Sequence, residues 1–157
     1  MTGRARPQRI PQCLGLASVA VGRYRLGMSL EIVATNAAPK AIGPYSQAVV
    51  APAGRLVFCS GQIAIDPQTG ELAGAGDVRL ETQHVMKNLE AVLRAAGTSF
   101  ASVVKSTIYL VDLGNFSVVN EVYATYFSGS PPARVTVQVA ALPRGAQVEI
   151  DAIAMAS

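Results

Sequence analysis

The sequence contains very few of the residues from which disulfide frameworks and metal sites are built. Among 157 residues there are two cysteines, Cys13 and Cys59, and a single histidine, His84. Two cysteines cannot form a disulfide framework or supply four ligands to a structural zinc ion. We therefore expect no metal site. A hydrolase of the Ser-His-Asp or Cys-His type would have to depend on His84 alone.

Long apolar runs are also missing, although the chain as a whole is rich in apolar residues. Hydrophobic residues make up 50% of the sequence, charged residues make up 15%, and the mean hydropathy is +0.33. A helix that crosses a bilayer needs about 20 consecutive apolar residues, and no stretch approaches that length, so we expect no membrane partner. The composition excludes a disordered chain, and the length fits one domain.

Excess positive charge is confined to the start of the chain. Residues 1–27 contain five arginines and no acidic residue, whereas residues 28–157 contain eight basic and ten acidic residues and so carry a net charge of −2. A nucleic-acid surface needs lysine and arginine clustered on the folded part of the protein. We therefore expect no nucleic-acid partner.

Residues 1–27 allow three interpretations. The apolar stretch 14–21 is at the short limit of a signal-peptide core, and the arginine-rich, acid-free composition is typical of an organellar transit peptide. The third interpretation is a start codon placed too early, because Met28 stands just before a predicted strand. We favour the third, and predict a folded domain of residues 28–157 and a cytoplasmic protein, unless the leader is a genuine targeting signal.

The pattern of apolar residues predicts eight elements in the order βββαβαββ. The period of 3.6 residues indicates a helix between Asp77, a potential N-cap, and Gly97, a potential C-terminal cap. The turn at 52–54 predicts a hairpin between its flanking strands, and the turn at 143–145 predicts that the last two strands pair. The predicted strands are residues 31–34, 46–51, 55–60, 103–111, 134–141 and 146–155, and the second predicted helix is 115–127.

This order predicts an α+β fold with a single sheet and two helices on one face. Several strands carry apolar residues on both faces, so the face without helices would be a large exposed apolar patch. A homo-oligomer in which sheets pack together would bury that patch. We therefore predict a homo-oligomer.

Arg134 and Glu149 are candidates for ligand chemistry. Arg134 begins a predicted strand directly after the stiff segment 131–133, and a guanidinium binds a carboxylate through two parallel hydrogen bonds. Glu149 lies on the strand expected to pair with that of Arg134, so it could approach the same end of the sheet. Arg134 is either a binding residue or an ordinary surface arginine, and Glu149 is either a salt-bridge partner or a group that handles protons.

In two further segments a polar side chain lies beside a rigid turn or beside a glycine. Tyr45 follows the rigid turn at 43–44, where its hydroxyl can reach a ligand or its ring can serve packing alone. Gly61, after Ser60, permits close approach of a ligand or another chain, or marks a bulge. Cys59 ends an apolar strand, which is typical of a small core residue rather than a nucleophile. None of these signals alone identifies a function.

Taken together, the motifs resemble those of the RidA/YjgF family of reactive-intermediate deaminases. The resemblance covers residues 30–154, nearly the whole predicted domain, and leaves out residues 1–27. The segments that carry it are Gly43-Pro-Tyr-Ser-Gln-Ala48, Ser60-Gly-Gln-Ile63, Asp66-Pro-Gln-Thr-Gly-Glu-Leu72, Gln83, Asn88-Leu89, Asp112-Leu113, Pro132-Ala-Arg-Val-Thr-Val-Gln-Val-Ala-Ala-Leu142 and Val148-Glu-Ile150.

The resemblance implies a chorismate-mutase-like fold and a homotrimer with three ligand clefts between subunits. It implies hydrolysis of 2-imino acids, or of enamine tautomers such as 2-aminoacrylate, to 2-oxo acids and ammonia, with no cofactor. By position, Arg134 would bind the substrate carboxylate and Glu149 would help to place the attacking water. The residues implied to line the cleft are Tyr45, Ser60, Gly61 and Asn120.

Thr136 is the one departure from the family pattern that bears on mechanism. Many members have cysteine two residues after the arginine, and this chain has Thr136, which we count with Arg134 and Glu149 among the catalytic candidates. If only the backbone of Thr136 is used, activity survives the replacement. A mechanism that requires a thiol would fail.

Three functional hypotheses follow. The first is a cofactor-independent 2-imino acid deaminase, in which orientation of an electrophilic imine and proton transfer supply the rate enhancement. The second is a non-catalytic protein that senses small 2-oxo or amino acids through Arg134. The third is the ribonuclease activity reported for some relatives, which the acidic domain disfavours.

Overall fold

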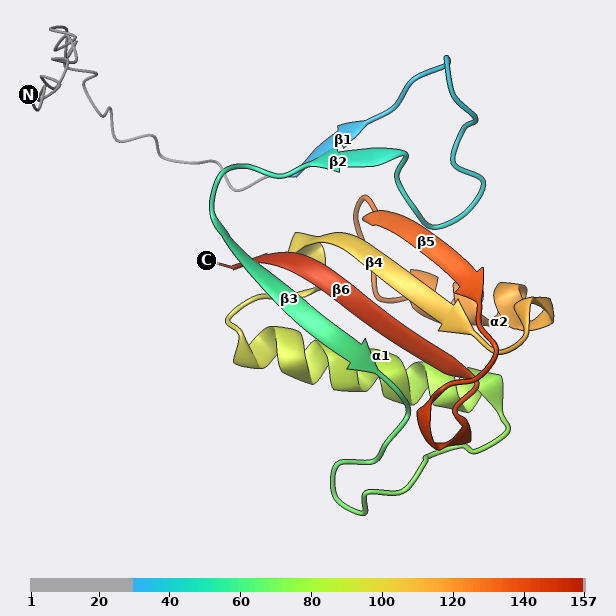
Figure 1. Ribbon diagram of the computed structural model, residues 1–157. Helices are drawn as coiled ribbons and strands as arrows, with labels where there is room; N and C mark the ends of the chain where they lie inside the picture. Colours follow the sequence, from blue (N-terminus) through green and yellow to red (C-terminus); the bar gives the residue numbers. More distant parts are fainter. Residues whose placement is uncertain (1–29, 157) are drawn as a thin grey trace, which may run out of the picture.

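The computed structural model of the protein describes residues 30–156 (Figure 1). The predictions made for residues 1–27 lie outside this range. Over the described residues, we find no helix with the length and apolar character needed to cross a membrane.

Strands and helices follow one another in the described residues in the predicted order βββαβαββ. Three short 3₁₀ turns, η1 (Phe100–Ser102), η2 (Leu113–Asn115) and η3 (Pro143–Gly145), connect some of them. The elements are β1 (Glu31–Val33), β2 (Ala48–Val50), β3 (Arg55–Gln62), α1 (Val78–Ala95), β4 (Val103–Leu110), α2 (Phe116–Ala124), β5 (Ala133–Gln138) and β6 (Val148–Ala156).

The strands form two sheets, so the prediction of a single sheet is wrong. β1 and β2 pair antiparallel as a separate hairpin, and the main sheet has the order β3-β6-β4-β5. β6 is antiparallel to both of its neighbours, whereas β4 and β5 are parallel. The main sheet therefore contains two βαβ crossovers, and in the first of them β6 is inserted between β3 and β4.

The predicted hairpin between residues 46–51 and 55–60 is wrong, because β2 pairs with β1 and not with β3. The Ser46 N–H donates to the carbonyl oxygen of Pro132 at 2.9 Å, which ties the chain to the β5 edge of the sheet, opposite the β3 edge. The Gln47 amide bonds the backbone of Thr35 and Pro39, each at 2.6 Å, and so fixes the β1–β2 hairpin. Residues 51–54 then carry the chain across to β3.

The predicted pairing of the last two strands is also wrong. The turn at 143–145 exists as η3, but β5 lies beside β4, and β6 occupies the centre of the sheet. The reason is the depth at which β6 is buried: Val148, Ile150 and Ala154 are all inaccessible to solvent. A strand so deeply buried needs hydrogen-bond partners along both edges, which the central position provides and an edge position does not.

Both helices have the predicted location, but the second is shorter than predicted. Asp77 caps α1 by accepting from the N–H groups of Arg79 and Leu80, and Gly97 follows the helix with φ +75°. α2 ends at Ala124 rather than at residue 127, because the chain tightens into 3₁₀-type bonds there. This tighter turn lets the rings of Tyr126 and Phe127 pack edge-on against Phe100, with centroids 5.2 and 5.5 Å away.

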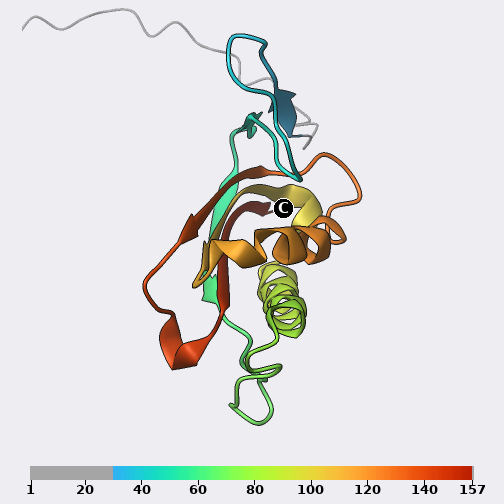
Figure 2. The ribbon, with the colours of Figure 1, turned by 90° about the vertical axis from the view of Figure 1, so that its right-hand side faces the viewer.

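The main sheet has one face covered by helices and one open face. α1 and α2 lie on the same side of the sheet, as predicted (Figure 2), and the side chains facing them form the hydrophobic core. The open face exposes apolar side chains in the described residues: Phe58 is 72% exposed, and Leu56, Val135 and Val137 are exposed as well. The sequence-based expectation of an apolar sheet face left without helices is confirmed.

Candidate functional site

Arg134 lies on β5 and points toward the helices. It stands opposite Ser106 of β4, and directly opposed residues share a face of the sheet. The Ser106 hydroxyl lies 2.7 Å from that of Tyr123 on α2, which identifies this face as the helix-covered one. Because β5 is an edge strand, the guanidinium lies at the side of the core rather than in its centre and stays half-buried.

Three aromatic rings and one amide surround the guanidinium. Its central carbon lies 5.1 Å from the ring centroid of Tyr123, 5.5 Å from that of Tyr45 and 5.6 Å from that of Phe116. All three distances are within the range of cation–π attraction. The Nη1 group also donates to Oδ1 of Asn120 at 2.7 Å. We call these five residues, Tyr45, Phe116, Asn120, Tyr123 and Arg134, the arginine cluster.

None of the five residues of the arginine cluster carries a carboxylate that could neutralise Arg134. The ion pairs formed within residues 30–156 are Arg79–Glu121, Arg94–Glu90 and Arg144–Glu71, so Arg134 has no anionic partner there. Burial lowers the pKa of Arg134 from its ordinary value, and smaller electrostatic interactions with Tyr123 and Tyr45 oppose this shift. Of the five N–H donors of an arginine, the bond to Asn120 uses one. The remaining donors suit a planar anion such as a carboxylate.

Tyr123 is the most deeply buried member of the cluster. Only 1% of its surface is exposed, and burial raises the pKa of Tyr123 to about 12, against the smaller opposing effects of its hydrogen bond with Ser106 and the charge of Arg134. The ring also packs against Phe127 with a centroid distance of 4.7 Å. Tyr123 is therefore neutral at physiological pH and serves the cluster through its ring and a fixed hydrogen bond.

Glu149 and Gly61 form a second group, on the other face of the sheet. Glu149 stands opposite Tyr109 of β4, on the open face. Its side chain lies over Gly61, so close that a Cβ atom at Gly61 would be 1.8 Å from Oε1 of Glu149. The register of β3 shifts between Cys59 and Gln62, which confirms the interpretation of Gly61 as part of a bulge. We call Ser60, Gly61 and Glu149 the glutamate cluster.

Within one chain, the arginine and glutamate clusters are separate. The prediction that Arg134 and Glu149 lie on paired strands is wrong, because β4 runs between β5 and β6. The register places Glu149 two strands and three residues away from Arg134, which corresponds to roughly 14 Å between Cα atoms. Their side chains also point to opposite faces. A single ligand cannot touch both groups in one copy of the chain.

Thr136 shares the helix-covered face with Arg134 but contributes no accessible hydroxyl. Its Oγ1 atom is buried and has no hydrogen-bond partner among the described residues. A substrate at the surface of β5 could therefore reach the backbone of Thr136 but not its side-chain oxygen.

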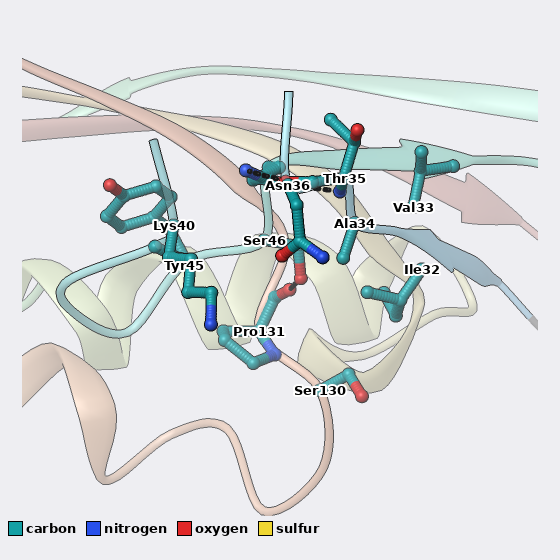
Figure 3. A pocket seen from close by; sticks show the side chains of 12 residues that line it. Ile32, Val33, Ala34, Thr35, Asn36, Lys40, Tyr45, Ser46, Ser130 and Pro131 are labelled. Carbon is teal, nitrogen blue, oxygen red and sulfur yellow. Dashed lines mark hydrogen bonds between the residues drawn. The ribbon is translucent and has the colours of Figure 1, made fainter. Parts of the chain in front are cut away.

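A cavity of about 590 Å³ lies between the β1–β2 hairpin and the segment at 130–131. Figure 3 shows the apolar side chains of Ile32, Val33 and Pro131 around it, together with the ammonium of Lys40. Tyr45 lines the cavity, and so connects it to the arginine cluster, but Arg134 and Asn120 do not line it.

Neither a metal site nor a reactive thiol is found in the part of the chain that the structure describes. No group of three or more His, Cys, Asp or Glu side chains could hold a metal ion there. Cys59 is buried, and burial, with a smaller contribution from Asp151, raises the pKa of its thiol, which disfavours the nucleophilic thiolate. The interpretation of Cys59 as a small core residue is confirmed.

Two members of the arginine cluster, Phe116 and Tyr123, were not predicted as site residues. Phe116, Asn120 and Tyr123 are separated by four and three residues on α2, so they share one face of the helix. That spacing is also typical of a stripe of core residues. The asparagine among the rings is the signal in the sequence that this face meets a polar group.

Residues 35–156 match the sequence model of a protein family described as Endoribonuclease L-PSP. Protein DfrA of Myxococcus xanthus is 58% identical over 82% of this chain and 97% of its own length. The 2-iminobutanoate/2-iminopropanoate deaminase of Mus musculus is 51% identical over 80% of this chain and 90% of its own length.

Solved structures are similar as well. A protein of the conserved Rid family from Yersinia pestis has a TM-score of 0.62 and 47% identity, over 81% of this chain and 99% of the other. TdcF of E. coli, whose structure contains bound serine, has a TM-score of 0.62 and 42% identity over 81% of this chain and 99% of that protein.

Proposed function

The chain belongs to the YjgF/RidA family, whose domain is described as Endoribonuclease L-PSP, and we propose that it hydrolyses 2-imino acids and their 2-enamine tautomers to 2-oxo acids and ammonia. Relatives from mouse, rat and human that are 47–51% identical are named 2-iminobutanoate/2-iminopropanoate deaminase. The observation in this chain that carries the proposal is Arg134, a half-buried guanidinium without an anionic partner in residues 30–156.

The reaction needs little from the protein. A protonated 2-imino acid and one water give a 2-oxo acid and an ammonium ion: the water oxygen bonds to C2, one of its protons passes to the nitrogen, the C2–N bond breaks, and the second proton passes from the oxygen to the departing ammonia. An enamine substrate first takes a proton at C3. Because the protonated imine is already electrophilic, orienting it and assisting proton transfer account for the acceleration.

Arg134 is proposed to hold the substrate carboxylate through a bidentate pair of hydrogen bonds. The three rings of the cluster contact the guanidinium, and the bond to Asn120 occupies one N–H. The other donors then fix the position of C2 relative to the surrounding protein. Asn120 therefore acts on the arginine, and Tyr45 borders the substrate from the loop side.

Glu149 is proposed to accept a proton from the attacking water, and the neighbouring Ser60 and Gly61 to line the same wall. Since the two clusters of one chain lie on opposite faces, we propose that the complete site forms between subunits, with the arginine cluster of one copy facing the glutamate cluster of the next. Such clefts require a closed oligomer, and we propose the homotrimer with a chorismate-mutase-like fold. The apolar open face supports this assembly, because oligomerisation would cover it.

The proposal is tested by producing 2-aminoacrylate from serine with a dehydratase and following pyruvate formation. The full chain should accelerate the release of pyruvate over the buffer rate. A pure, folded protein that gives no acceleration would contradict the proposal.

Replacing Thr136 with valine tests the burial of its hydroxyl. The variant exchanges an unpartnered buried hydroxyl for a methyl group of similar size, so the free energy of unfolding should rise by about 1 kcal/mol and the melting temperature by a few degrees. Thr136→Ser, which keeps the hydroxyl and loses the methyl group, is the comparison variant and should not gain stability. A valine variant that melts at or below the wild-type temperature would show that the hydroxyl is satisfied in the assembled protein.

A second candidate function is a sensor of small amino or 2-oxo acids. The observation that favours it is the serine bound in the structure of TdcF. Titration with 2-oxobutanoate, together with the imine assay, separates the two functions: binding without turnover supports the sensor. The family description also names a ribonuclease, but residues 28–157 carry a net charge of −2, and we expect no RNA binding at any salt concentration.

A further inference from the structure

The aromatic part of the arginine cluster has a geometry that the deaminase proposal does not use. The rings of Tyr45, Phe116 and Tyr123 come from a loop, from the first residue of α2 and from its last full turn, and all three contact one guanidinium. Rings packed around a guanidinium restrict its rotation, and all of its N–H donors lie in the guanidinium plane. The three rings therefore restrict the directions in which those donors can point.

The two α2 rings are held very differently by the rest of the protein. Tyr123 is fixed by burial and by its hydrogen bond with Ser106, the residue directly opposite Arg134 on β4. Phe116 is 38% exposed and belongs to no buried cluster of the described residues. Its large apolar ring lies at the surface, 5.6 Å from the guanidinium carbon of Arg134. The ring therefore buries less apolar surface, and contributes less to the free energy of unfolding, than a fully buried ring such as that of Tyr123.

Resting on the proposed function, we infer that Phe116 is a positioning residue: together with Tyr123 and Asn120 it holds the Arg134 guanidinium in the plane that binds the substrate carboxylate. Tyr123 supplies a rigid ring from the core, Asn120 fixes the Nη1 edge at 2.7 Å, and Phe116 contacts the guanidinium from the surface. Without Phe116 the long, flexible arginine side chain gains freedom, and the carboxylate must then be captured by a less ordered group.

This inference is tested with two variants of one position. Phe116→Leu removes the π face but keeps an apolar side chain, and Phe116→Tyr keeps the ring. Arg134 binds the substrate carboxylate equally well in the ground state and in the transition state. A weaker interaction between them should therefore raise KM and leave kcat little changed. For Phe116→Leu we expect a rise of about tenfold in KM, the same rise in the Kd of 2-oxobutanoate and an unchanged melting temperature. Phe116→Tyr should restore the wild-type values.

The arginine itself provides a second test, because a residue that acts only through Arg134 has no effect once Arg134 is gone. In an Arg134→Lys background, Phe116→Leu should change neither KM nor the Kd of 2-oxobutanoate further, which is the non-additivity of coupled residues. Equal effects of Phe116→Leu in both backgrounds would overturn the positioning role, as would a wild-type KM for Phe116→Leu.

The outcomes separate this inference from the function it rests on. A wild-type protein that converts the imine, with Phe116→Leu behaving identically, overturns the positioning role and leaves the deaminase intact. A wild-type protein that binds 2-oxobutanoate without turnover overturns the deaminase, and the Kd values of the variants then decide the positioning role alone. A wild-type protein that neither binds nor converts these acids overturns both.

Discussion

Replacing Arg134 with lysine is expected to lower kcat/KM for a 2-imino acid at least about 100-fold. Lysine keeps the positive charge but loses the planar fork, so the carboxylate is held by one hydrogen bond where arginine offers two. A hydrogen bond to a charged group contributes about 1.5–3 kcal/mol, and loss of orientation at C2 adds to this. The measurement is steady-state kinetics of 2-aminoacrylate hydrolysis, with the melting temperature recorded beside it.

The melting temperature decides whether Arg134 serves the ligand or the fold. Breaking a buried ion pair costs about 3–5 kcal/mol, but Arg134 has no anionic partner within residues 30–156, so Arg134→Lys should melt close to the wild type. Arg144→Lys is the matched control, since Arg144 is 58% exposed and lies 3.7 Å from Glu71. An Arg134→Ala protein that unfolds or dissociates would make the residue structural. A stable variant with normal turnover would remove Arg134 from the mechanism.

Replacing Gly61 with alanine is expected to reduce kcat about 100-fold with little loss of stability. The new Cβ would lie 1.8 Å from Oε1 and 2.7 Å from Cδ of Glu149, so the carboxylate must swing away. The backbone of Gly61 needs no positive φ, and the displaced atoms belong to the end of a flexible side chain. The fold can therefore accommodate the alanine. General base catalysis, which contributes roughly 10²–10⁴-fold to the rate, is lost because the carboxylate has left its position.

Two further variants show whether Gly61 acts through Glu149. Glu149→Gln should lower kcat as much as Gly61→Ala, and the double variant should be no worse than either alone, because both remove the same carboxylate from its place. Gly129→Ala is the control: a Cβ there meets nothing within 4 Å, and we expect wild-type kinetics. Additive losses in the double variant would mean that Gly61 has a role separate from Glu149.

Local features of the fold were predictable from the sequence, and long-range pairing was not. The start of α1 follows from Asp77, whose side chain caps the N–H groups two and three residues ahead, and such a signal lies entirely within the helix. The pairing of β2 depends instead on Ser46 meeting Pro132, and two apolar runs beside a short turn look the same whether they pair or not. The place of β6 depends on which strand edges are left free after all other strands have formed.

The site was predictable only as a set of residues and not as an arrangement. Arg134, Tyr45 and Asn120 were expected together, and they do meet. Glu149 was expected beside Arg134 because the last two strands were expected to pair. In the structure β4 separates these strands, and Glu149 lies on the open face of the sheet. Phe116 and Tyr123 have a spacing that fits a core stripe, so only the position of Arg134 in three dimensions shows what their rings contact.

The central position of β6 also has a consequence for the order in which the protein is made. β3, β4 and β5 leave the ribosome before β6, yet β3 has no other partner in the main sheet, and β4 is joined to β3 only through β6. Until residues 148–156 have emerged, the nascent chain exposes two unpaired strand edges and the apolar side chains that later face α1. The main sheet therefore cannot form before β6 has been made, and the unpaired edges and apolar surface exposed until then favour aggregation.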